Sequence, residues 1–154
     1  MEEKEGIDQM VLRIGINGFG RIGRVTYRAL LEKGAQVVAI NDLTDSKTLA
    51  HLLRYDSLYD KLPFEVRASN SSIFVNGNEI RTFWEKEPEK VPWGDLGVEY
   101  VIESTGVFRD KEGASRHLKA GASRVIVTAP MKDPDLTVVM GVNEEQFQPG
   151  KHRI

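Results

Sequence analysis

The residues of this chain best suited to chemistry are Gly18-Phe19-Gly20-Arg21-Ile22-Gly23, which have the spacing G-x-G-x-x-G. The glycines follow an apolar run that predicts a strand and open a segment that predicts a helix. There the first glycine permits a tight turn, the second lets a ligand approach the backbone, and the third lets helix and strand pack closely. Free N–H groups at the helix start attract phosphate. The pattern indicates a dinucleotide pyrophosphate site, and a turn that serves packing only is the alternative.

A single carboxylate complements this motif. Asp42 ends the second predicted strand, 19 residues after Gly23, where a carboxylate accepts hydrogen bonds from the adenosine ribose hydroxyls. A 2′-phosphate would meet a like charge there, so Asp42 favours NAD over NADP. The alternative role for Asp42 is the N-cap of the next helix, but Thr44 and Asp45 are better placed for it.

The elements that would position these groups alternate between strand and helix. Apolar runs predict strands at 11–16, 36–40, 99–103, 124–128 and 137–140, and helical periodicity predicts helices at 21–33, 45–55 and 110–120. Gly34 and Gly121 are the expected stops of the first and third helices. This alternation predicts an α/β fold, a Rossmann-like, doubly wound and mostly parallel sheet.

Residues 64–83 depart from that plan. Asn76-Gly77 lies between two strand-like flanks and predicts an antiparallel hairpin inserted in the fold. Two prolines make residues 84–95 a connecting loop. Residues 1–10 are polar and acidic, and we expect a flexible N-terminal extension there, or residues upstream of a start at Met10. Residues 11–154 form the expected NAD(P)-binding Rossmann domain.

Composition narrows the class of protein further. The 154 residues carry a net charge of −2, which gives no basis for binding nucleic acid or an anionic membrane surface. The apolar runs are too short to span a bilayer, and the first residues do not resemble a secretory signal. The chain has no cysteine, which is compatible with a cytoplasmic location. We find no metal-ligand spacing and expect no metal.

Several segments of the chain resemble glyceraldehyde-3-phosphate dehydrogenases and occur in that family's order. They are residues 13–24, 39–44, 52–57, 103–108, 127–130 and 139–143. The resemblance implies the cofactor half of a phosphorylating dehydrogenase that uses NAD, is cytoplasmic and assembles as a homotetramer. A cofactor half of an erythrose-4-phosphate dehydrogenase and a free-standing NAD-binding regulatory module are the alternatives.

The resemblance also assigns roles to residues. It places the pyrophosphate at the glycine motif, the ribose at Asp42 and the nicotinamide near residues 128–129. Lys86 stands at the adenine end where the family commonly has arginine, and it keeps the charge without the planar fork. The implied cofactor-binding residues are Asn17, Gly18, Gly20, Arg21, Ile22, Gly23, Asp42, Lys86, Thr105, Gly106, Phe108, Thr128 and Ala129.

The family's chemistry uses a cysteine that attacks the aldehyde and a histidine that acts as acid and base. By resemblance the cysteine falls beyond Ile154 and the histidine later still, in a catalytic domain. We therefore expect no catalytic residue in this chain and no activity from it alone. His51, His117 and His152 have no nucleophile partner in view, which is typical of surface or packing residues. Residues 151–154 resemble the start of another strand. Without that strand and a C-terminal helix of the family, we expect a sheet edge and an apolar helix-packing face to be exposed and NAD to bind more weakly than in a complete enzyme.

Overall fold

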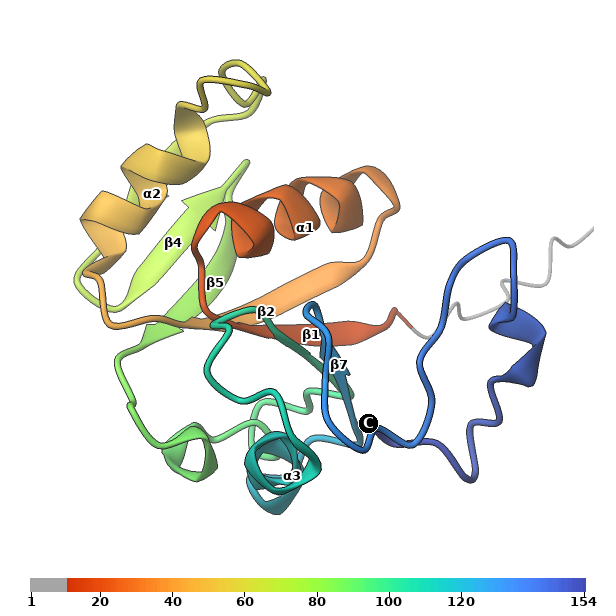
Figure 1. Cartoon of the computed structure of the whole chain (residues 1–154). Helices are drawn as coiled ribbons and strands as arrows, with labels where there is room; N and C mark the ends of the chain where they lie inside the picture. The colour runs from red at the N-terminus through yellow and green to blue at the C-terminus, as the bar shows by residue number, and fades with distance from the viewer. Residues whose placement is uncertain (1–10) are drawn as a thin grey trace, which may run out of the picture.

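A computed structural model describes residues 11–154, and their centre is a seven-stranded sheet (Figure 1). The strand order is β3-β4-β5-β2-β1-β6-β7. Strands β5, β2, β1, β6 and β7 run parallel, and β4 pairs antiparallel with both β3 and β5. The bounds are β1 (Arg13–Asn17), β2 (Gln36–Asn41), β3 (Val66–Ala68), β4 (Ser72–Val75), β5 (Asn78–Phe83), β6 (Tyr100–Glu103) and β7 (Arg124–Val127). The predicted fold class is confirmed, and the predicted extension at 1–10 lies outside the described residues.

The path of the chain through the sheet reverses next to β1. From β1 the chain passes to β2 on one side, and it later adds β6 and β7 on the other side. In open parallel sheets, ligands bind at such a switch point, beyond the carboxyl ends of the strands. The predicted glycine motif follows β1 at this point, and residues 104–106 follow β6.

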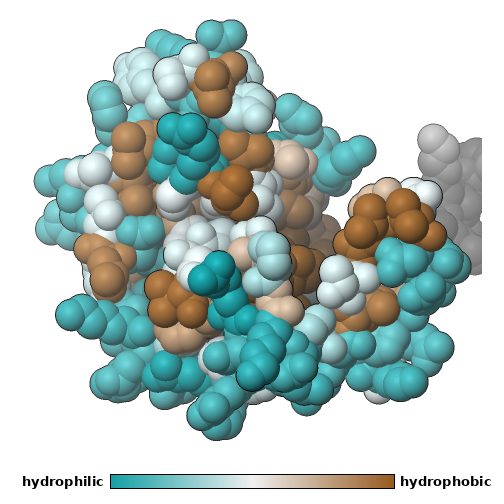
Figure 2. Space-filling view, in the orientation of Figure 1, coloured by the Kyte–Doolittle hydropathy of each residue, from teal (hydrophilic) through white to brown (hydrophobic). Residues whose placement is uncertain are grey.

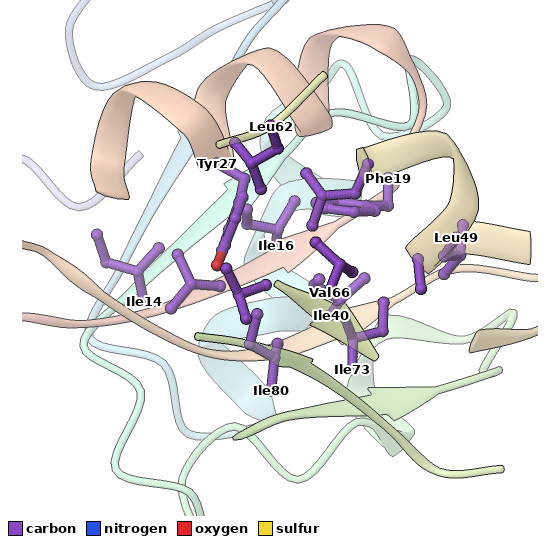
Figure 3. Close-up of a cluster of buried hydrophobic side chains, with 14 of the residues drawn as sticks. Ile14, Ile16, Phe19, Tyr27, Ile40, Leu49, Leu62, Val66, Ile73 and Ile80 are labelled. Atoms are coloured by element: carbon purple, nitrogen blue, oxygen red, sulfur yellow. The ribbon is translucent and has the colours of Figure 1, made fainter. Parts of the chain in front are cut away.

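Helices cover both faces of the sheet. Helices α1 (Arg21–Glu32) and α2 (Ser46–Arg54) lie on one face, and α3 (Lys111–Lys119) lies on the other with a short 3₁₀ turn, η1 (Pro88–Lys90) (Figure 1). The first face buries a continuous cluster that includes Ile16, Tyr27 and Leu49 (Figure 3). The second buries Trp93 and Val101. The loop expected at 84–95 therefore supplies part of the core.

Local signals predicted the ends of these elements well. Gly34 ends α1 with φ +72°, and Gly121 follows α3 with φ +99°. Asn76 and Gly77 join β4 to β5 with φ values of 50° and 81°, as a two-residue hairpin turn with positive φ at both positions requires. The inserted hairpin is confirmed, with β3 as an additional edge strand.

The strand predicted at 137–140 does not form in the described chain. Val139 and Met140 are 54% and 78% exposed, so the apolar run has no neighbouring strand or helix to pack on. Asn143 closes a loop instead, because its side chain accepts from Val139 N (2.7 Å) and donates to Thr137 O (2.9 Å). A run of apolar residues forms a strand only where the edge of a sheet is available to pair with it.

The last residues behave similarly. Residues 151–154 contribute one backbone bond beside β7, from Val125 N to Arg153 O (2.8 Å), but form no strand. A second 3₁₀ turn, η2 (Glu144–Gln146), precedes them. Hydrophobic side chains gather on the surface of this C-terminal region (Figure 2). No helix within residues 11–154 has both the length and the hydropathy that crossing a membrane requires.

Candidate functional site

The glycine loop, residues 18–23, contains three glycines in three different environments. Gly18 has φ +89°, and a Cβ there would lie 2.8 Å from Thr105 N. A Cβ on Gly23 would lie 2.2 Å from Gly18 O, so neither position accepts a side chain. A Cβ on Gly20 meets no described atom within 4 Å. The first and third glycines are therefore closed by packing, and the second faces open space, as a backbone that receives a ligand must.

The start of α1 differs from the starts of the other two helices. Asp45 caps α2 by accepting from Thr48 N (3.0 Å), and Asp110 caps α3 by accepting from Gly113 N (2.7 Å). Among the described residues no side chain caps α1, whose N-cap is Gly20. Arg21 and Ile22 in its first turn are exposed. The N-terminal amides and the positive end of the helix dipole are thus available to an anion beside Gly20.

Asp42 lies on the β2 side of the glycine loop and is half-buried. One carboxylate oxygen accepts from Phe19 N (2.7 Å) and the other from Thr44 N (2.9 Å). Each oxygen has two lone pairs, so acceptor capacity remains on both. Because Asp45 is the N-cap of α2, the alternative role considered for Asp42 is wrong. The carboxylate instead ties the glycine loop to the end of β2.

Glu103 ends β6 on the other side of the loop and is 2% exposed. Its Oε2 accepts from Asn17 Nδ2 (2.6 Å) and His117 Nε2 (2.7 Å). Its Oε1 accepts from Thr105 N (2.8 Å) and from the Thr105 hydroxyl. Burial raises the pKa of Glu103, but the hydrogen bonds from His117, Thr105 and Asn17 outweigh it and hold the pKa below its ordinary value.

These bonds continue in both directions through the interior. Asn17 Oδ1 accepts from Asn41 Nδ2 (2.7 Å), and Asn41 pairs with the backbone N and O of Glu85 (2.8 and 2.9 Å). At the other end Trp93 Nε1 donates to His117 Nδ1 (3.0 Å). We call this chain, from Trp93 through His117, Glu103, Asn17 and Asn41 to Glu85, the buried polar network.

The structure brings most of the predicted site residues together at the strand ends. The turn after β6 abuts the glycine loop, because Ser104 Oγ donates to Gly18 O (2.6 Å) and Gly18 packs on Thr105. Gly106 continues that turn with φ +75°. Thr128, just after β7, donates from its backbone N to Glu103 O (3.1 Å), and the half-buried Ala129 follows it.

Three predicted residues differ from the others in their placement. The side chain of Asn17 is buried in the polar network and does not face the loop surface. Phe108, which precedes α3, packs edge-on against the His117 ring of that helix, with centroids 6.2 Å apart. Lys86 is exposed directly after Glu85, which Asn41 holds.

Sequence reasoning assigned no site role to Glu103, Asn41, His117 or Trp93. A signal was present, because Asn17, Asn41 and Glu103 are the polar last residues of three otherwise apolar strands. Buried polar groups at such positions need partners. His117 was expected to be a surface or packing residue, and it is fully buried between Trp93 and Glu103.

Residues 12–111 match the family model described as "Glyceraldehyde 3-phosphate dehydrogenase, NAD binding domain". The chain belongs to this family. Its relatives include the glyceraldehyde-3-phosphate dehydrogenases of Thermotoga maritima, 58% identical over 89% of this chain and 42% of the relative, and of Geobacillus stearothermophilus, 50% identical over 94% and 44%. That of Streptomyces coelicolor is 50% identical over 94% of this chain and 44% of its own length. The chain thus spans less than half the length of these relatives.

The residues present fit the cofactor of this family, which is NAD. A pyrophosphate needs backbone without a side chain, and Gly20 offers it beside the uncapped start of α1. A ribose diol needs an acceptor at the end of β2, and Asp42 keeps lone pairs for it. The glycine loop, Asp42 and the turn at 104–106 are called the strand-end site below.

Proposed function

We propose that this chain is the cofactor half of a phosphorylating glyceraldehyde-3-phosphate dehydrogenase, with residues 11–154 as its NAD-binding domain. In this proposal it works in the cytoplasm, within a homotetramer and beside a catalytic domain. The observation that carries the proposal is the contrast within the glycine loop, where Gly20 is open while Gly18 and Gly23 are closed by packing. Neither packing nor a positive φ requires glycine at position 20, and a ligand against its backbone supplies a reason for it.

The roles of the residues follow from their positions. The pyrophosphate lies against Gly20 and the first amides of α1, near Arg21, and Asp42 accepts from the ribose. Lys86 lies toward the adenine end. When bound, NAD supplies a nicotinamide ring that accepts a hydride.

The far end of the cofactor falls to a second group of residues in this proposal. The turn at 104–106 follows β6, and residues 128–129 follow β7, so both lie at the carboxyl edge of the sheet. They orient the nicotinamide and exclude water from one of its faces. Asn17 and Phe108 act indirectly, since the first holds Glu103 and the second packs on α3.

The chemical step itself depends on residues outside this chain. This chain has no cysteine, and a thiol is the nucleophile in the mechanism that the family resemblance implies. The catalytic domain would supply both the thiol and the general base. The part played by this chain is to bind and orient NAD, with Asp42 disfavouring the 2′-phosphate of NADP.

Calorimetric titration of the purified chain tests the cofactor assignment. We expect NAD to bind one site per chain and NADP to bind at least about tenfold more weakly, since one uncompensated like-charge contact costs roughly 1.4 kcal/mol or more. Equal affinities would remove Asp42 from the discrimination, and no heat with either nucleotide at millimolar concentration would contradict the binding role.

A chimaera tests the larger proposal. Residues 11–154 are joined to the remaining part of the Thermotoga maritima relative, and NADH formation from glyceraldehyde 3-phosphate, phosphate and NAD is followed by absorbance. We expect turnover from the chimaera and none from the chain alone. A folded chimaera that binds NAD without turnover would contradict the proposed reaction and leave the cofactor assignment standing.

A further inference from the structure

The buried polar network lies behind the strand-end site and meets it at Thr105, whose backbone N and hydroxyl donate to Glu103. It joins the ends of β1, β2 and β6 to α3 and to residues 85–93. We infer that Glu103 is a positioning residue for the dinucleotide, whose carboxylate holds the glycine loop and the Thr105 turn in the geometry that receives the cofactor. This inference rests on the proposed NAD-binding function.

The direction of every hydrogen bond in the network is determined from its two ends. The backbone N–H of Glu85 can only donate, so the side-chain atom of Asn41 that it contacts must be the oxygen, Oδ1. The other side-chain atom of Asn41 is then Nδ2, and its two hydrogens go to Glu85 O and Asn17 Oδ1. Asn17 is left with its Nδ2 facing Glu103. From this side the carboxylate therefore receives a donor.

The other end gives the same result. The indole of Trp93 can only donate, so Nδ1 of His117 accepts and the ring carries its proton on Nε2, which faces Glu103. Thr105 adds its backbone N–H and its hydroxyl. Four donors thus converge on Glu103 from three segments of the chain, and only an ionised carboxylate accepts all of them.

A glutamine at this position cannot satisfy the same partners. If its NH₂ group faced Asn17 and His117, both of these side chains would have to accept a hydrogen bond from it. Turning the Asn17 amide over would bring its NH₂ group against the NH₂ group of Asn41, and moving the His117 proton to Nδ1 would bring it against the indole N–H of Trp93. If the NH₂ group faced Thr105, it would oppose the backbone N–H there. Either arrangement leaves buried donors unpaired, which is costly and displaces their segments.

The displaced segments are the walls of the strand-end site. The Thr105 hydroxyl accepts from Val107 N (3.1 Å) and so shapes the turn around Gly106. The glycine loop is joined to the same turn, because Gly18 packs closely against Thr105 N and Ser104 Oγ donates to Gly18 O (2.6 Å). Glu103 itself is 2% exposed, and its influence on a bound dinucleotide passes through Thr105 and Asn17.

The test compares Glu103→Gln with Glu89→Gln. Glu89 is a matched control, because it also bonds a residue of α3, Arg116 (2.7 and 2.8 Å), but lies outside the network. NAD affinity is measured by calorimetry, and the ¹⁵N shifts of His117 and the Thr105 amide are measured on the same samples. We expect Glu103→Gln to weaken NAD at least about tenfold, by the loss of a charge-assisted bond, and to shift both resonances. Glu89→Gln should change neither.

A second pair of variants keeps the test independent of whether Glu103→Gln folds. His117→Leu removes one donor to Glu103 at a distance from the strand-end site, and His117→Gln keeps a group that can donate to Glu103 and accept from Trp93. We expect His117→Leu to weaken NAD severalfold and His117→Gln to restore most of the affinity.

Two results would overturn the inference while leaving NAD binding itself established. One is unchanged NAD affinity in a folded Glu103→Gln or His117→Leu protein, even if its melting temperature falls. The other is equal loss of affinity in His117→Leu and His117→Gln. If the unaltered chain binds no NAD, the proposed function fails first, and the two failures are therefore distinguishable.

Discussion

Asp42 and Glu103 lie on opposite sides of the glycine loop, one after β2 and the other at the end of β6. Asp42 is half-buried, and each of its oxygens accepts one backbone N–H. Glu103 is buried, and each of its oxygens accepts two hydrogen bonds. The two carboxylates thus differ in unused acceptor capacity more than in residue type. A carboxylate with free lone pairs can bind a ligand, whereas one whose lone pairs are all occupied holds the binding segments in place.

The glycines of the loop show the same division. Gly23 packs against Gly18 O and leaves no room for a side chain, whereas Gly20 faces open space. One position thus serves the fold and the other remains for a ligand. The same substitution should therefore have different consequences at Gly20 and at Gly23, and likewise at Asp42 and at Glu103.

The largest effect is expected for Gly23→Ala. Its Cβ would lie 2.2 Å from Gly18 O, which is backbone and has little freedom to move. We expect the free energy of unfolding to fall by about 3 kcal/mol, at the upper end of overpacking costs, and NAD binding to be lost. Urea denaturation and calorimetry measure the two effects, and a fall below about 1 kcal/mol would contradict the close approach.

Gly20→Ala is the matched control for that variant. Gly20 has φ −71° and ψ −160°, which alanine adopts without strain, and its Cβ meets no described atom within 4 Å. We expect the free energy of unfolding to change by less than about 0.5 kcal/mol while NAD affinity falls. Unimpaired binding would show that no ligand lies against this glycine.

Asp42→Asn should weaken NAD binding by about 1.5–3 kcal/mol, the value of a hydrogen bond to a charged group. The effect on NADP should be smaller, because the change also removes the repulsion of the 2′-phosphate. Titration of both nucleotides measures the ratio. A ratio unchanged from that of the unaltered chain would remove Asp42 from cofactor choice.

Glu103→Gln should lower the free energy of unfolding at pH 7 by about 1–3 kcal/mol, the cost of leaving buried donors unpaired. The pKa of Glu103 in the folded chain lies below its ordinary value of 4.5. Its contribution is therefore fully present above pH 4.5 and is lost as the pH falls through the lower folded value. Denaturation of both proteins between pH 7 and pH 3 should show the gap narrowing, and a gap that widened would contradict an ionised Glu103.

The smallest effect on NAD binding in this comparison is expected for Asp45→Ala, which removes the side-chain cap of α2. The free energy of unfolding should fall by about 1 kcal/mol, and NAD affinity should stay the same because the bonds of the Asp45 carboxylate go to Thr48, within α2. A loss of NAD affinity as large as that of Asp42→Asn would contradict the division between a capped α2 and an α1 whose start is available to the ligand.

The parts of this molecule that could be predicted from sequence are those controlled by nearby residues. The glycine loop, the Asn76-Gly77 turn and the stops at Gly34 and Gly121 depend on backbone conformations that one or two residues determine. Strands β1, β2 and β6 were predicted from apolar runs that are buried on both faces. Asp42 was identified because its distance from the glycines reflects one strand–helix–strand unit.

Other parts depend on partners far away along the chain. Asn17 and Glu103 are 86 positions apart, and Trp93 and His117 are 24 apart, so no local pattern shows that they meet. The run at 137–140 looked like the other strands, and only the absence of a neighbouring strand in the described chain distinguishes it. Pairing between distant segments is what sequence patterns leave open.

The central claim is that a dinucleotide lies against Gly20 and the start of α1, and its most direct test is an NMR titration of the ¹⁵N-labelled chain with NAD. We expect the largest amide shifts on residues 18–23 and 105–106, with smaller ones near Asp42. The pocket between α2 and β3, lined by Lys47, His51 and Tyr55 among others, should stay unchanged. Shifts confined to that pocket, or an unperturbed glycine loop in a sample that binds NAD, would contradict the account.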